Sequence, residues 1–227
     1  HLAATKLAPA VQVDKKIEDA AAVVPQGSNA EAGGALVSRH LAGENEAQAS
    51  SASEFLPLPQ NLKSDDQRRW LILREVLLSK NDNDPRLDSE LRGLSPELKA
   101  ELRKGYHELA TEKLNERGTL AFLVGREASN SAELSFLKSV LDEPPCLSLT
   151  DCKKSAPVSA DEDSGLGQNV SLIYPQLVSL QMLGRTLSED SSSPELKAKA
   201  RQLLVQATKS PIAPIAQMAQ NILRSVK

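Results

Sequence analysis

The six residues Ser193-Pro194-Glu195-Leu196-Lys197-Ala198 decide the fold, because the same series, Ser-Pro-Glu-Leu-Lys-Ala, also occurs at positions 95–100. Serine caps the first backbone N–H groups of a helix, proline fits its first turn, and glutamate there faces the positive end of the helix dipole. A third Ser-Pro pair, Ser210-Pro211, precedes the C-terminal segment. We therefore predict that a helix begins at each of these three places.

Further helix signals extend on both sides of these series, from residue 64 onward. Capping residues or a first-turn proline stand at four more places, which are Ser64 with Gln67, Asp84-Pro85, Asn130 with Glu133, and Tyr174-Pro175. Gly118 is predicted to end the helix that begins after Ser95, and a separate helix is expected around Leu120. Alternating strand patterns and hairpin turn pairs are not found in the sequence. We predict an all-α domain.

The expected architecture is six to eight helices stacked as antiparallel hairpins, either as a right-handed α-solenoid or as an irregular bundle. Leucine occurs 35 times and aromatic residues make up only 3% of the 227 residues, so the core is expected to be aliphatic. The positions predicted to be buried recur at helical spacing. They are Leu98, Leu102, Leu109, Leu137, Leu180, Leu203, Ile215 and Leu223.

Composition excludes several classes of protein. The net charge of −3 is too close to balance to favour general nucleic-acid binding. The longest apolar runs are a few residues, far short of the roughly 20 that span a bilayer, so no transmembrane segment is expected. Two cysteines are too few for a disulfide-dense miniprotein or a four-cysteine zinc cluster.

The chain divides into two parts by composition. Residues 1–63 contain 14 alanines and one aromatic residue, Phe55, and are predicted to be a largely disordered, flexible N-terminal arm. Residues 64–227 are predicted to be the helical domain, with a loop insertion at 143–170. Residues 55–59 form an apolar strip that either continues the arm as a linker or lies in a groove of the domain. The first residue is His1, which fits a processed, exported protein and a fragment equally well.

The last third of the chain resembles α-helical repeat proteins of the HEAT and armadillo-like type. Residues 174–180 (Tyr-Pro-Gln-Leu-Val-Ser-Leu) look like the first helix of a HEAT unit, and residues 193–200 look like the second. The resemblance covers residues 172–227 and, more weakly, 96–142. It implies an α-solenoid that binds a partner along a concave face, without indicating which partner.

Residues that could carry catalysis or bind a metal or cofactor are few, and none forms a recognised motif. Of the three histidines, His107 alone lies in the helical part, and it has no carboxylate or second histidine one helical turn away. Glu108, Glu112 and Glu116 are spaced four residues apart and are interpreted as a solvated face of one helix. The remaining candidates, interpreted as loop or surface features, are Asp161-Glu162-Asp163, Gly165-Leu166-Gly167 and the basic residues Lys197, Lys199, Arg201, Lys209, Arg224 and Lys227. We predict no catalytic residue, metal or cofactor, and no binding of nucleic acid.

Cys146 and Cys152 are the only cysteines, and both follow Pro144-Pro145 in the predicted insertion. Five intervening residues allow a turn to bring their Cα atoms within disulfide distance. We predict a disulfide that pins the insertion, and with it an exported protein of the periplasm or extracellular space. Two free thiols in a cytosolic protein, or a redox pair, are the alternatives.

The leading functional hypothesis is therefore a non-enzymatic helical-repeat module that binds another protein or a peptide. An accessory or structural subunit of a larger assembly is one alternative. A hydrolase with a dispersed active site is the other. The sequence does not indicate the oligomeric state.

Overall fold

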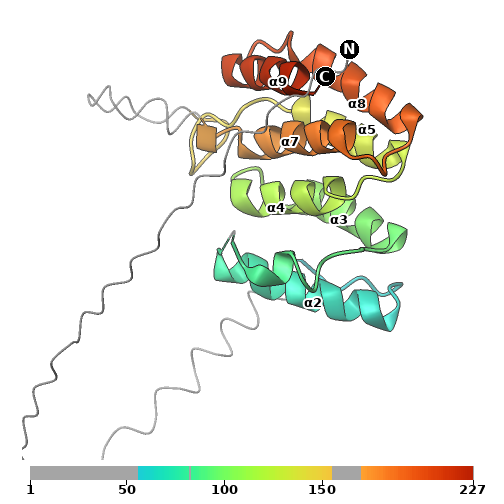
Figure 1. Ribbon diagram of the computed structural model, residues 1–227. Helices are drawn as coiled ribbons and strands as arrows, with labels where there is room; N and C mark the ends of the chain where they lie inside the picture. The colour runs from blue at the N-terminus through green and yellow to red at the C-terminus, as the bar shows by residue number, and fades with distance from the viewer. Residues whose placement is uncertain (1–55, 82, 155–169, 227) are drawn as a thin grey trace, which may run out of the picture. The chain divides into compact units, whose positions relative to one another are not determined.

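The computed structural model describes residues 56–81, 83–154 and 170–226, and in these residues all regular secondary structure is helical (Figure 1). The predicted all-α fold is confirmed, and the seven α-helices of the described residues fall within the expected six to eight. The predicted arm, apart from its last eight residues, and positions 155–169 of the predicted insertion lie outside the described residues. The helices are α2 (Ser64–Ser79), the 3₁₀ helix η1 (Pro85–Leu87), α3 (Pro96–Glu108), α4 (Leu114–Gly125), α5 (Ser131–Leu141), α7 (Tyr174–Ser188), α8 (Pro194–Ala207) and α9 (Ala213–Ser225).

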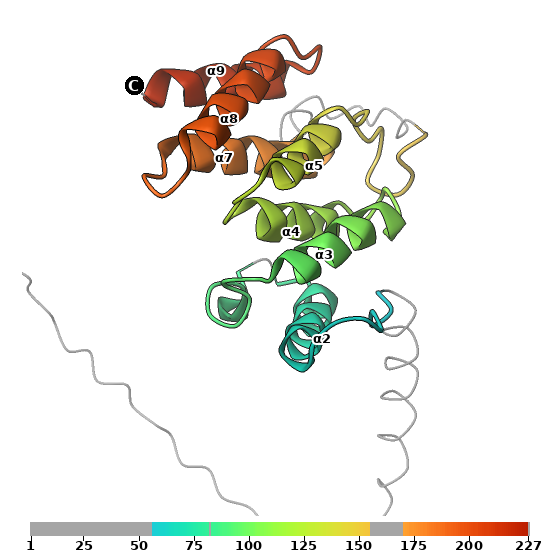
Figure 2. The ribbon, with the colours of Figure 1, turned by 90° about the vertical axis from the view of Figure 1, so that its right-hand side faces the viewer.

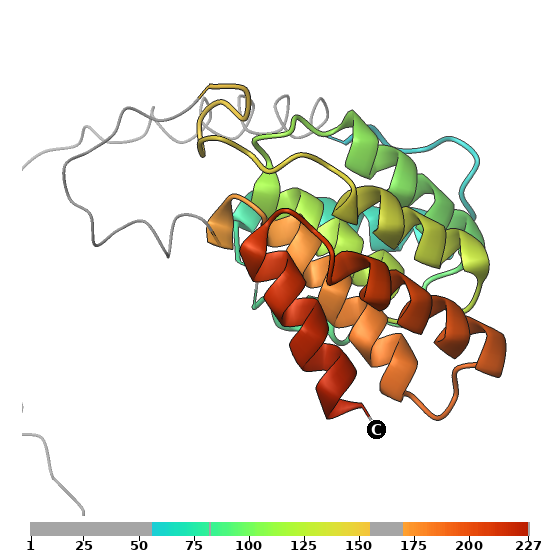
Figure 3. The same cartoon turned by 90° about the horizontal axis from the view of Figure 1, so that it is seen from above.

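The helices pack as successive pairs, α3 with α4, α5 with α7, and α8 with α9. Helix α7 lies at the centre of the packing, where it contacts α4, α5, α8 and α9. Figure 2 shows the pairs following one another from α2 to α9. Figure 3, which looks at the stack from the α9 end, shows α8 and α9 lying over α7. The stacking of helices that the sequence predicted is thus present.

The two identical six-residue series begin two helices in the same way. Ser95 Oγ accepts a hydrogen bond from the Leu98 N–H at 3.0 Å, and Ser193 Oγ accepts one from Leu196 at 3.3 Å. The third Ser-Pro pair does not begin its helix directly. Helix α9 begins at Ala213, with Ile212 as its N-cap, because a second proline follows and occupies the first turn.

The boundary between α3 and α4 lies before the predicted position at Gly118. Helix α3 ends at Glu108, since Leu109 is extended, and α4 begins at Leu114 and runs through Gly118. Gly118 is therefore inside a helix and does not terminate one. A Cβ atom at this position would overlap the ring of Tyr174, so glycine is required there for the close approach of α7.

The core is aliphatic as expected, and seven of the eight residues predicted to be buried are buried. The exception, Leu223, is only half-buried because α9 is the last helix of the described stack. Leu56 and Leu62 are buried as well, with exposed fractions of 1% and 7%. These two leucines, which lie in the segment assigned to the arm, pack onto the helices, and Leu56 covers Gly105 of α3.

Two buried cationic side chains, Arg126 and Lys99, donate hydrogen bonds to backbone carbonyl groups of other segments. The sequence did not indicate either contact. The guanidinium of Arg126 donates hydrogen bonds to the carbonyl oxygens of Leu87 and Leu91, and so fixes the segment after η1 against α4. Burial lowers the pKa of Arg126, which two nearby carboxylates partly offset. Lys99 donates to the Glu127 carbonyl at 2.6 Å and lies 3.3 Å from the Glu133 carboxylate.

Candidate functional site

Cys146 and Cys152 lie at disulfide distance, with their Cα atoms 4.2 Å apart. They close the short segment 146–152, which we call the Cys loop. Its ends are tied together by a hydrogen bond from the Leu147 N–H to the Cys152 carbonyl at 3.1 Å. The pairing predicted from the sequence is therefore compatible with the fold, and the pair follows α5 as expected.

Polar groups inside the Cys loop fix its conformation. Ser148 is buried, and its hydroxyl accepts a hydrogen bond from the Asp151 N–H at 3.0 Å and donates one to the Asp151 carbonyl at 2.9 Å. Asp151 is in turn bound by Lys154, whose amino group lowers the pKa of the Asp151 carboxyl. Because Ser148 is turned inward, its two neighbours point outward. Leu147 is 47% exposed and Leu149 is 55% exposed.

The Cys loop is attached to the turn between α3 and α4. The Glu112 carboxylate accepts a hydrogen bond from the Cys152 N–H at 3.2 Å. Hydrogen bonds from its own N–H and from that of Cys152 hold the pKa of Glu112 below its ordinary value. Glu112 thus anchors the loop, and the interpretation of Glu108, Glu112 and Glu116 as one helical face is wrong. Glu108 ends α3, Glu112 lies in the turn, and Glu116 belongs to α4.

A pocket of about 440 Å³ lies between the Cys loop, the start of α4 and the start of α7. We call it the Arg117 pocket. Its walls are mainly apolar, and its polar side chains are Thr111, Arg117, Glu143, Lys153 and Gln176. The apolar walls come from Leu114, Pro144, Pro145, Leu147, Leu172 and Pro175, together with the two cysteines.

A buried ion pair bounds the Arg117 pocket. Arg117 Nη2 donates to Glu143 Oε1 at 2.8 Å, and the exposed fractions of the two side chains are 7% and 23%. The guanidinium lies 4.2 Å from the centre of the Tyr106 ring, and Nε donates to the Tyr106 carbonyl at 3.4 Å. One arginine therefore connects α3, α4 and the segment after α5.

Two neutral groups complete this cluster. The Tyr106 hydroxyl donates to Glu143 Oε2 at 3.0 Å, and Gln176 Nε2 donates to the Glu143 carbonyl at 3.4 Å. Burial raises the pKa of the Tyr106 phenol; Glu143 adds to this effect and Arg117 opposes it. The phenol therefore stays protonated at neutral pH and remains a hydrogen-bond donor. Each Glu143 carboxylate oxygen accepts one hydrogen bond from the cluster.

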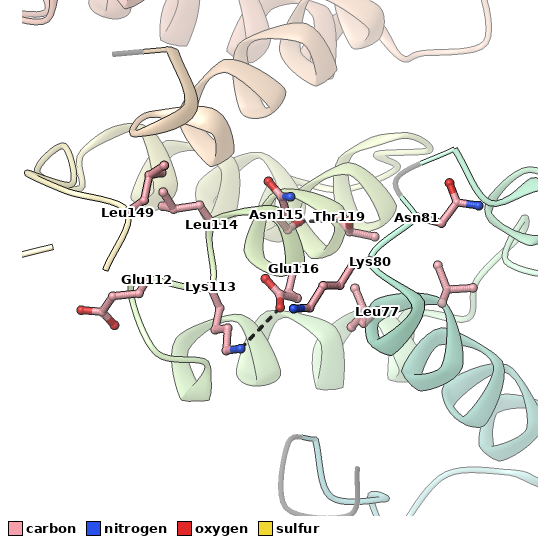
Figure 4. Close-up of a pocket in the computed structure, with 11 residues that line it drawn as sticks. Leu77, Lys80, Asn81, Glu112, Lys113, Leu114, Asn115, Glu116, Thr119 and Leu149 are labelled. Carbon is pink, nitrogen blue, oxygen red and sulfur yellow. Dashed lines mark hydrogen bonds and ion pairs between the residues drawn. The ribbon is translucent and has the colours of Figure 1, made fainter. Parts of the chain in front are cut away.

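A smaller pocket of about 240 Å³ lies on the other side of Leu114, between the end of α2 and the turn into α4 (Figure 4). We call it the Lys80 pocket. Leu149 of the Cys loop forms part of its wall. Lys113 lies 3.7 Å from the Glu116 carboxylate, and Figure 4 shows the Lys80 side chain also pointing toward Glu116. The Cys loop thus has a pocket on each side, with one exposed leucine at each.

The other residues considered in the sequence analysis lie apart from the Cys loop or outside the described residues. His107 is exposed and contacts the rings of Tyr106 and Phe136 edge-on. Glu108 lies 3.8 Å from Lys104 on the surface. The basic residues Lys197, Lys199, Arg201, Lys209 and Arg224 are exposed or half-buried on α8, α9 and the turn between them. Asp161-Glu162-Asp163, Gly165-Leu166-Gly167, His1, His40 and Lys227 lie outside the described residues.

Two kinds of site are absent from the described residues. No three His, Cys, Asp or Glu side chains come close enough together in residues 56–81, 83–154 and 170–226 to hold a metal ion. In the same part of the chain, no helix has both the length and the apolar character needed to cross a bilayer.

Comparison with known proteins found no similarity. Nothing matches the chain among protein-family models, curated proteins or solved structures. The functional interpretation therefore depends on the geometry of the Cys loop and its pockets.

Proposed function

We propose that the chain is a non-enzymatic helical module that binds another protein or a peptide, and that the Cys loop is its contact surface. The observation that carries this proposal is the pair of exposed leucines, Leu147 and Leu149, on a short loop whose two cysteines lie at disulfide distance. Flexible loops lose conformational freedom on binding, whereas a loop held in one conformation loses little.

The surroundings of the loop support the proposal. An exposed apolar group beside a concave, mainly apolar pocket is typical of protein interaction sites. Leu147 lines the Arg117 pocket and Leu149 lines the Lys80 pocket, so a partner can contact the leucines and enter the depressions beside them. An α-solenoid of the HEAT type, as the sequence resemblance suggests, would be a suitable scaffold for such a surface.

The proposal is tested by capturing partners from native extract with the full chain and two matched variants. The first variant carries Leu147→Ser and Leu149→Ser. The control carries Leu71→Ser and Leu78→Ser on α2, where the side chains are exposed to a similar extent, 45% and 44%. Burying a leucine contributes about 1.5–3 kcal/mol. We therefore expect the loop variant to retain at least tenfold less partner, and the control to retain as much as the wild type. Equal retention by all three chains contradicts the proposal.

We further propose that the protein functions in an oxidising compartment, in the periplasm or outside the cell. The support is the cysteine pair at disulfide distance, because such bonds persist mainly where thiols are not kept reduced. Alkylation without reductant, followed by intact-mass measurement of protein from its native compartment, tests this. No alkylation at Cys146 and Cys152 is expected, and modification of both contradicts the proposal.

A further inference from the structure

We infer that the Arg117 pocket binds the C-terminal end of a partner polypeptide, taking up its last apolar side chains and its terminal carboxylate. The inference rests on the proposed function, since it names the part of the partner that the Cys loop surface recognises. It concerns the pocket itself, whereas the proposed function concerns the exposed leucines.

The size and walls of the pocket fit an apolar chain end. Its volume of about 440 Å³ is within the range of pockets that bind small ligands, roughly 300–1,000 Å³. The wall formed by Pro144, Pro145 and Leu172 offers few competing polar groups to a side chain that enters. Exposed Leu147 lies at the same pocket, where it can cover an apolar residue of the ligand.

The charges that line the pocket favour an anion. Arg117 and Lys153 are positive and Glu143 is negative, so the lining carries one net positive charge. The Glu143 carboxylate is already bound by Arg117 and by the Tyr106 hydroxyl. A cationic ligand would therefore have to compete with the guanidinium for Glu143, whereas an anionic ligand would not.

Arg117 supplies the donor that a carboxylate needs. Its side chain is 93% buried, as its exposed fraction of 7% implies. A guanidinium has five N–H donors, and in Arg117 one at Nε donates to the Tyr106 carbonyl and one at Nη2 donates to Glu143. A planar guanidinium that lines a pocket is well suited to a carboxylate, and capture of a C-terminal carboxylate is a recurring way of recognising peptides. Lys153, exposed at the rim, adds a second positive charge.

Calorimetric titration of the full chain with three probes tests the inference. The first is the peptide acetyl-Gly-Ser-Ala-Leu-Leu with a free carboxylate, the second is the same peptide as its C-terminal amide, and the third is octanoate. We expect the acid to bind at least tenfold more tightly than the amide. Equal affinity of acid and amide, binding of neither, or binding of octanoate alone overturns the inference.

Two exposed lysines provide a matched pair of variants, and both leave the buried cluster intact. Lys153→Gln removes a charge from the pocket rim and is expected to weaken binding of the acid peptide twofold to fivefold. Lys104→Gln, whose side chain lies near Glu108 on α3 and does not line the pocket, is expected to leave the affinity unchanged. An equal effect of both substitutions contradicts the assignment. If acid and amide bind alike while the leucine variant still loses its partner, this inference fails and the proposed function stands.

Discussion

Replacing Arg117 by methionine is expected to destabilise the protein by about 2–4 kcal/mol. Breaking a buried ion pair by removing one partner typically costs about 3–5 kcal/mol, and the 23% exposure of Glu143 reduces this because water can solvate the remaining carboxylate. The substitution also removes the donor to the Tyr106 carbonyl and the stacking over the Tyr106 ring. Methionine retains much of the apolar stem of arginine, so the change is mainly in charge and hydrogen bonding.

The assay is thermal and urea unfolding of the wild type, Arg117→Met, Glu143→Gln and the double variant. For a folded unit of this size, 1 kcal/mol shifts the melting temperature by about 2–4 °C, so Arg117→Met should melt roughly 4–16 °C lower. Glu143→Gln should also cost about 2–4 kcal/mol, because it leaves the more deeply buried Arg117 guanidinium without a counter-charge although the amide oxygen still accepts a hydrogen bond. The double variant should be less destabilised than the sum of the two single variants. Additive effects, or an Arg117→Met change below about 0.5 kcal/mol, would refute the connecting role of Arg117.

Three further predictions concern packing and pH. Leu203→Ala should cost about 2–5 kcal/mol in chemical unfolding, whereas Val205→Ala, two residues along α8 but 46% exposed, should stay within about 0.5 kcal/mol; equal effects would show that the helix faces are assigned wrongly. Gly125→Ala should lower stability by about 1–2 kcal/mol in the same assay, because the new Cβ would lie 2.6 Å from Cβ of Met182; a variant more stable than the wild type would contradict this close packing. The lowered pKa of Glu112 means that its bond to the Cys loop stabilises the fold above its ordinary value of 4.5 and is lost as the pH falls through the lowered pKa. The protection of the Cys152 amide against exchange, relative to the intrinsic exchange rate at each pH, should therefore fall in acid, and Glu112→Gln should abolish this pH dependence; an unchanged acid response in that variant would refute it.

The fold class could be predicted because its signals are local. A serine cap with a first-turn proline acts within four residues, so the identical series at 95–100 and 193–198 predicted two helix starts correctly. The buried positions followed from helical spacing, because residues three or four positions apart lie on the same face of a helix. Leucines at that spacing therefore pack together against the neighbouring helix. Leu223 failed this rule because α9 is the last helix in the part of the chain that the structure describes.

The helix boundary near Gly118 could not be predicted, because it depends on a distant residue. Glycine after a polar stretch usually ends a helix, but here it makes room for the ring of Tyr174, 56 positions further along the chain. The sequence also left two alternatives for residues 55–59, a linker or a strip that lies in a groove, and Leu56 packs against α3.

Of the candidate site, only the proximity of the two cysteines could be predicted. Two cysteines with five residues between them indicate a loop whatever the fold is. The pocket beside that loop depends on Arg117 and Glu143, which come from different helical segments and carry no local motif. Their ion pair forms only because the fold brings Arg117 Nη2 within 2.8 Å of Glu143 Oε1.

Hydrogen–deuterium exchange of the full chain, alone and in complex with a protein captured from native extract, tests the proposed contact surface most directly. If the Cys loop is that surface, the partner should slow exchange in residues 144–153, at the start of α7 and at the end of α2, and leave α8 and α9 unchanged. Slower exchange confined to α2, or to α8 and α9, with the Cys loop unchanged, would contradict the proposal.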